Sequence, residues 1–174
     1  MTGDMARHPR SHHETLLGAV SFGFFLLLLG ALFISTPNLP DNIVTFLSHY
    51  QTIHVESLNV NVPIPEHLGD AVGLNVYVAA RNFSLVWGIF MGVMLATRFV
   101  LSSKTRRKAQ NSGDIAFWLG AAFLVQTLLV ETTQATTIND RIWYEFWAGI
   151  IVLIGVSLII RGIFLAVARA ARSS

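Results

Sequence analysis

The region from Phe83 to Val130 constrains the fold of this chain more than any other. It consists of two apolar runs, FSLVWGIFMGVMLATRFVL and IAFWLGAAFLVQTLLV, joined by the basic segment SSKTRRKAQNSGD. A helix of about 20 apolar residues crosses a hydrocarbon core of roughly 30 Å. We therefore predict a transmembrane helical hairpin whose basic tip lies in the cytoplasm.

The composition also indicates a membrane protein. Of the 174 residues, 53% are hydrophobic and 13% are charged, whereas soluble domains carry about 25% charged residues. Lipid must then cover part of the surface. The chain has no cysteine, which excludes disulfides, thiolate metal sites, iron–sulfur clusters and cysteine nucleophiles. The formal net charge of +2 is too small to indicate a nucleic-acid partner.

Four segments of the chain have the length and apolar character of membrane spans. They predict an all-α fold, an integral membrane four-helix bundle that forms a single transmembrane domain over residues 1–174. Asp114 is the expected N-cap of the third helix. The four spans are residues 16–35, 83–101, 115–131 and 142–160.

The lysines and arginines predict how these spans are oriented. If both termini are cytoplasmic, ten of the twelve cationic residues lie on the cytoplasmic side, including those of the basic turn at 102–114. Only Arg81 and Arg141 lie outside. This split follows the excess of positive charge in cytoplasmic loops. We expect a multi-pass protein of the cell membrane with both termini in the cytoplasm.

Residues 36–82 form the one long polar segment and are predicted to lie outside the cell. After Asp41, apolar residues recur at three- and four-residue spacing as far as Ile53, which predicts an amphipathic helix of about three turns. The alternation in residues 56–65 indicates extended chain, with room for one short strand. A further helix is expected to start near Pro65 and to run through Tyr77 into the second span.

Imidazole and carboxylate side chains in this outer loop are candidates for a zinc or copper site. The competing interpretation is that these histidines are simply solvated, because ligand pairs on a helix usually stand three or four residues apart. The candidate ligands are His49, His54, Glu56 and His67.

Two polar residues of the third span, Gln126 and Glu131, suggest either a pathway or a structural contact. A charge inside a membrane is costly and is usually paired. In the functional interpretation they belong to a proton or ion path that opens outward. In the structural interpretation Glu131 pairs with Arg81 or Arg141 and joins the outer helix ends.

Two further features predict contacts with lipid or with other proteins. Small residues at four-residue spacing in the second span, Gly88, Gly92 and Ala96, let another helix approach closely. The basic turn could bind anionic lipid headgroups or an acidic partner, although setting the topology alone would explain it. The cationic residues of the turn are Lys104, Arg106, Arg107 and Lys108.

No catalytic motif stands out in the sequence, and no cofactor is indicated. We expect a non-catalytic structural or accessory subunit of a larger membrane protein complex. Its partners would be the bilayer and either other membrane subunits or a second copy of the chain. Two alternatives remain open. One is a small oligomeric transporter or channel that uses the polar residues of the third span, and the other is a metal-binding outer loop that serves an enzyme complex.

Overall fold

The computed structural model describes residues 10–55, 59–101, 105–135 and 140–173. Within these ranges the protein is mostly helical, and four helical segments are long and apolar enough to cross a membrane. The first, second and fourth are α1 (Arg10–Ser35), α3 (Ala71–Val100) and α6 (Asp140–Ser173). The third is continuous from Thr105 to Gln134 and has three parts: α4 (Thr105–Leu124), η1 (Val125–Val130) and α5 (Glu131–Gln134).

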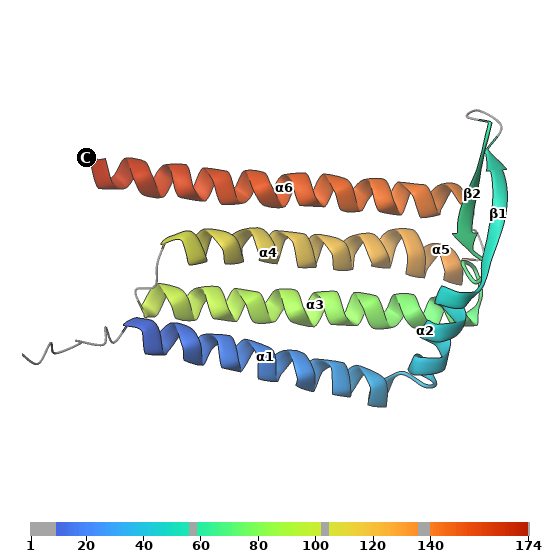
Figure 1. Ribbon diagram of the computed structural model, residues 1–174, viewed down its shortest axis with the longest axis horizontal. Helices are drawn as coiled ribbons and strands as arrows, with labels where there is room; N and C mark the ends of the chain where they lie inside the picture. Colours follow the sequence, from blue (N-terminus) through green and yellow to red (C-terminus); the bar gives the residue numbers. More distant parts are fainter. Residues whose placement is uncertain (1–9, 56–58, 102–104, 136–139, 174) are drawn as a thin grey trace, which may run out of the picture.

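The four spanning segments lie side by side in a row, in the order α1, α3, α4, α6 (Figure 1). Among the spanning segments, contacts join each helix to the next one in this order, and they are extensive between α3 and α4 and between α4 and α6 but sparse between α1 and α3. Little of α1 or of α6 is buried, whereas the third segment, inside the row, is buried most. The row therefore has two open edges that lipid or another protein must cover.

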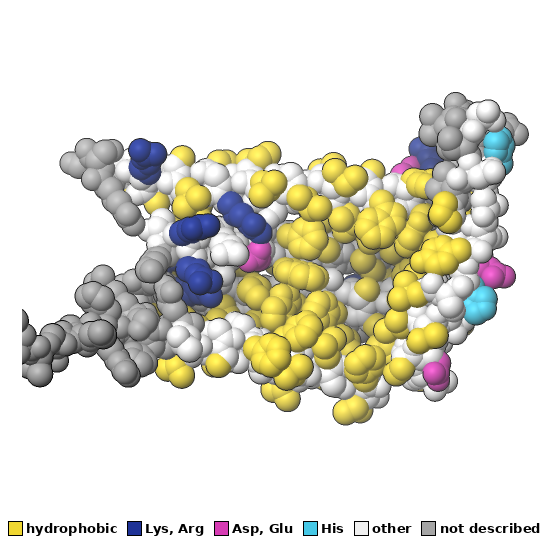
Figure 2. Space-filling model, in the orientation of Figure 1, with side chains coloured by type: hydrophobic (Ala, Val, Ile, Leu, Met, Phe, Trp, Pro, Cys, Tyr) yellow, Lys and Arg dark blue, Asp and Glu magenta, His cyan; other side chains and the backbone are white. Residues whose placement is uncertain are grey.

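The two ends of the row differ in charge and in structure. Helix α1 begins and α6 ends at the same end (Figure 1). We call it the basic end, because cationic side chains of α3, α4 and α6 gather there (Figure 2). The opposite end carries α2 (Leu39–Ser48), β1 (Tyr50–Val55) and β2 (Val60–Pro65), and we call it the hairpin end.

The two strands form an antiparallel hairpin, so the prediction of an all-α fold is wrong at this point. Ile53 pairs with Val62, and Thr52 pairs with Pro63. Pro63 cannot donate a ladder hydrogen bond, but a two-stranded sheet has only edge strands, where proline is tolerated. The predicted amphipathic helix is present but ends at Ser48, because the chain turns extended at His49 (φ −109°, ψ 110°) and then pairs with β2.

The turn after the hairpin is fixed to the helices at Leu68, which is buried. Its carbonyl accepts hydrogen bonds from the hydroxyls of Tyr77 in α3 (3.1 Å) and Thr133 in α5 (3.4 Å). Asp70 caps α3 by accepting from the backbone N–H of Gly73 at 2.9 Å. The predicted helix does run through Tyr77 into the second span, since α3 extends from Ala71 to Val100. Its predicted start near Pro65 is wrong, because Pro65 is the last residue of β2 and pairs with Tyr50.

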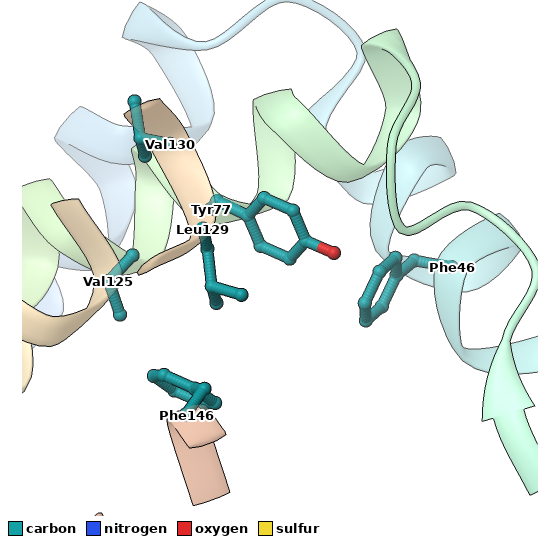
Figure 3. Close-up of a cluster of buried hydrophobic side chains, with 6 residues drawn as sticks. All are labelled: Phe46, Tyr77, Val125, Leu129, Val130 and Phe146. Carbon is teal, nitrogen blue, oxygen red and sulfur yellow. The ribbon is translucent and has the colours of Figure 1, made fainter. Parts of the chain in front are cut away.

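A cluster of buried side chains holds the hairpin end together (Figure 3). Phe46 comes from α2, Tyr77 from α3 and Phe146 from α6, and three residues of η1 complete the cluster. The rings of Phe46 and Tyr77 meet edge to face at 5.7 Å. The η1 residues of the cluster are Val125, Leu129 and Val130.

The third helix begins earlier than predicted. Asp114 is not its N-cap, because α4 already starts at Thr105 and takes in most of the predicted basic turn. Arginine and lysine are good helix formers, and contacts to the neighbouring helices fix this first part. Asn111 accepts a hydrogen bond from Arg98 of α3, and Asp114 pairs with Arg161 of α6.

Candidate functional site

A chain of polar side chains connects α3 to the third helix in the half of the row nearer the hairpin end. Arg81 donates from Nη1 to Oε1 of Gln126 at 2.7 Å, and Gln126 donates from Nε2 to Oε1 of Glu131 at 3.1 Å. Arg81 also donates to Oδ1 of its neighbour Asn82, at 3.1 Å from Nε and 2.8 Å from Nη2. The expected link between Arg81 and Glu131 therefore passes through Gln126.

The π-helical segment η1 makes this connection possible. On an α-helix, residues five apart point about 140° away from each other. In η1 the backbone N–H of Glu131 bonds to the carbonyl of Gln126, which is the five-residue pattern of a π-helix. This pattern brings the two side chains to the same side of the helix. Arg141, the other expected partner of Glu131, forms an ion pair with Glu145 instead (2.7 Å).

The charge of Arg81 is half-buried within a spanning segment. Two amide oxygens, from Asn82 and Gln126, accept its hydrogen bonds, and the carboxylate of Glu131 is the next group along the chain. Glu131 is exposed at the hairpin end. These hydrogen bonds join α3 to the third helix. They also place the cation of Arg81 and the carboxylate of Glu131 at the two ends of one chain of polar side chains.

The candidate metal ligands do not gather in one place. The rings of His49 and His67 lie edge to face at 5.6 Å. The Nδ1 atom of His67 lies 2.5 Å from Oδ2 of Asp70, and that of His54 lies 2.9 Å from Oδ1 of Asn61 on the paired strand. Among the residues that the structure describes, no three His, Asp or Glu side chains are close enough to hold a metal ion. Glu56 lies outside the described residues.

His67 and the start of α3 perturb Asp70. Partial burial would raise the pKa of its carboxyl group, but the Gly73 N–H and His67 act in the opposite direction and together lower it. The ionised form of Asp70 is the one that caps the helix and pairs with His67. The contact therefore has a structural role, which is to fix the turn that follows the hairpin.

A second polar cluster lies near the basic end and was not foreseen from the sequence. Arg98 of α3 donates from Nη1 to Oδ1 of Asn111 (2.5 Å) and to the backbone carbonyl of Arg107 (3.3 Å). Arg161 of α6 donates from Nη2 to Oδ1 of Asp114 at 2.5 Å. The spacing of Asn111 and Asp114 is three residues, so helix over 105–114 would have placed them on one face.

The predicted cations of the basic turn are placed around this cluster. Lys108 lies over the ring of Phe99, with Nζ 4.5 Å from the ring centre, which is a favourable cation–π position. Arg106 and Arg107 are exposed. Lys104 lies outside the described residues.

The three small residues of α3 have different surroundings. An added Cβ at Gly88 would come within 2.7 Å of Leu119 in α4, so this glycine lets the two helices approach closely. An added Cβ at Gly92 would meet nothing within 4 Å, and Ala96 is exposed. The first residue serves packing within the chain, and the other two face outward.

No protein-family model, no curated protein and no solved structure matches this chain.

Proposed function

We propose that the protein is a non-catalytic subunit of a larger assembly in the cell membrane. The observation that supports this most is the open row of helices, whose outward faces carry glycines with no covering side chain. Transmembrane helices associate mainly by close packing at small residues, because lipid is as apolar as their side chains.

The glycines inside the row support the same proposal. A Cβ added at Gly88, Gly120 or Gly149 would meet a leucine side chain of the neighbouring helix. This chain thus uses glycine where one helix packs on another. Other glycines have open space within 4 Å of the position of a Cβ, and we infer that a partner covers Gly92 of α3 and Gly155 of α6 among them. They are Gly18, Gly23, Gly30, Gly92, Gly155 and Gly162.

Extraction in mild detergent tests the proposal. The wild-type chain should migrate with other membrane proteins, or with further copies of itself, at a mass well above that of one chain in its micelle. Gly92→Leu and Gly155→Leu should release a folded single chain, because the added bulk occupies faces that are open within the chain. Ala80→Leu is the matched control, since it adds bulk at an exposed position elsewhere on α3.

Two results would contradict the proposal. If the wild-type protein is a single chain after mild extraction, or if Gly92→Leu and Gly155→Leu leave the assembly unchanged, the proposal is wrong.

The second candidate function is a small transporter or channel, and the line from Arg81 through Gln126 to Glu131 favours it. Polar groups that lie inside a membrane often mark ion or proton pathways, and π-helical segments are frequent at functional sites. Reconstituted into liposomes, the protein should then give an ion or proton flux that Glu131→Gln abolishes. A flux that the substitution does not alter, or no flux, would reject this function and leave the first proposal standing.

A further inference from the structure

The basic end carries far more positive than negative charge. In α3, α4 and α6 together, the only carboxylate near this end is Asp114. Arg161 donates to that carboxylate, and Arg98 of α3 donates to Asn111, three residues before it on α4. Figure 2 shows lysine and arginine side chains grouped on one face around a single acidic side chain. Cations from three helices therefore face one anion.

Two buried donors in this cluster lack an acceptor. Asn111 is 4% exposed, and its Oδ1 accepts from Arg98 while its Nδ2 has no hydrogen-bond partner. Nε of Arg161 is also buried without a partner. Unpaired buried donors are costly, and native proteins usually satisfy them with a ligand, a water molecule or another group. The cluster is therefore deficient in acceptor oxygens as well as in negative charge.

An apolar groove of about 380 Å³ adjoins the cluster on α6. Its lining begins one residue before Arg161 and continues toward the end of the helix. The ring of Phe164, in this lining, lies 6.3 Å from the ring of Phe99 in α3, and Lys108 covers Phe99. The lining residues are Ile160, Ile163, Phe164, Val167, Ala168 and Ala171.

A single molecule with an anionic, oxygen-rich head and a hydrocarbon tail matches both the excess of positive charge in the cluster and the apolar groove beside it. We propose that the basic end binds one anionic phospholipid. Its phosphate lies against Arg98, Lys108 and Arg161, and one acyl chain lies in the groove of α6. Guanidinium and ammonium groups form strong charge-assisted hydrogen bonds with phosphate, and basic pockets between spanning helices suit anionic headgroups. The proposal is independent of what the chain assembles with.

Thermal unfolding of the full-length protein in a neutral detergent, with lipid added, tests the proposal. Phosphatidylglycerol should raise the melting temperature in a saturable manner, whereas phosphatidylcholine and inorganic phosphate at the same concentrations should not. The phosphatidylcholine arm tests the need for charge, and the phosphate arm tests the need for the tail. A short polyglutamate peptide provides the test for an acidic protein partner.

Two variants examine the two halves of the site separately. Arg98→Gln removes one charge, which contributes about 1 kcal/mol at a membrane surface, so half-saturation should need about fivefold more phosphatidylglycerol. Ala168→Phe adds bulk inside the groove, two helical turns beyond Arg161, and should abolish saturation in the same range. Arg141→Gln and Ala148→Phe make the same changes near the hairpin end and should leave the response as in the wild type.

Several outcomes would overturn the proposal. Equal stabilisation by phosphatidylcholine would remove the role of charge, and stabilisation by phosphate alone would remove the role of the groove. A response to polyglutamate without a response to phosphatidylglycerol would assign the surface to a protein. If Arg98→Gln does not fold, an unchanged lipid response in Ala168→Phe is by itself sufficient to reject the site.

Discussion

The carbonyl of Leu68 shows how few atoms connect the hairpin to the helices. It is buried and accepts from Tyr77 and Thr133, which belong to helices far apart in the sequence. A carbonyl with two acceptor positions tolerates the loss of one donor much better than the loss of both.

We therefore expect that removing both hydroxyls costs more stability than the sum of removing each one alone. Tyr77→Phe alone should lower the free energy of unfolding by about 0.5–1.5 kcal/mol, and Thr133→Val alone should do the same or less. The double variant leaves the carbonyl unpaired and should cost more than the sum of the two. Chemical unfolding in detergent measures all three, and simple additivity would contradict the shared role of the carbonyl.

Asp70 permits a second prediction at the residue scale. Asp70→Ala removes the N-cap of α3 and should destabilise the protein by about 1 kcal/mol at neutral pH. Asp70→Asn keeps capping ability but loses the charge that pairs with His67, so its effect should be smaller. Melting temperatures of the two variants, compared with the wild type, measure the difference.

The pH dependence follows from the lowered pKa of Asp70. Its folded-state pKa lies below the unfolded value, so the carboxylate stabilises the fold fully above the unfolded pKa. This contribution is lost as the pH falls through the folded-state pKa. The wild type should lose stability over this acidic range more steeply than Asp70→Asn, and parallel pH profiles would show that the ionised carboxylate contributes nothing.

At the scale of elements, η1 determines which side chains of the third helix meet α3. We expect Gln126→Leu to cost about 1.5–3 kcal/mol, because Arg81 then loses an acceptor for a charge-assisted hydrogen bond. Glu131→Gln leaves a side chain that can still accept from Gln126, so it should change stability little. Equal losses in both variants would mean that Arg81 depends on the carboxylate itself.

Substitution by alanine should change the free energy of unfolding in opposite directions at glycines packed inside the row and at glycines on its outward faces. A Cβ at Gly113 would contact Arg161 and come within 2.8 Å of the backbone carbonyl of Ser157, so Gly113→Ala should destabilise by about 1–3 kcal/mol. Gly155→Ala has open space and should stabilise the single chain by about 0.5–1 kcal/mol through better helix propensity. Unfolding in detergent compares the two, and the same sign for both would contradict this packing.

The spans themselves were predictable because their apolar runs are long and nearly uncharged, a signal that needs no knowledge of neighbours. The end of α2 was not, because Tyr50 and Ile53 continue the three- and four-residue spacing of the helix, although they lie in β1. The choice between helix and strand depends on pairing with residues 60–65. The start of α4 also depends on distant contacts, those of Asn111 with Arg98 and of Asp114 with Arg161.

The candidate site was predictable only in part. Gln126 and Glu131 stand out as polar residues in an apolar span, but their contact depends on η1, and no residue in VQTLLV indicates a π-helix. Gly88, Gly92 and Ala96 look equivalent in the sequence. Only the position of Leu119 on α4 separates the first of them from the other two.

At the scale of the whole molecule, the orientation in the membrane remains a prediction from the positive charges. The chain contains no cysteine, so single cysteines can be placed freely at exposed positions. In intact cells, a membrane-impermeant maleimide should label Thr52→Cys on β1. It should label Gln110→Cys on α4 only after the membrane is opened. Labelling of both from the same side would overturn the topology.

The order of the row has a consequence for synthesis of the chain. Helices α3, α4 and α6 follow one another in the sequence as they do in space, so each can pack on its predecessor as soon as it leaves the translocon. The main neighbour of α1 among the spans is α3, which emerges only after residues 36–70 have been synthesised. Until then α1 has no neighbouring span and is surrounded by lipid. It can be stable there because the segment from Thr15 to Ser35 contains no charged residue.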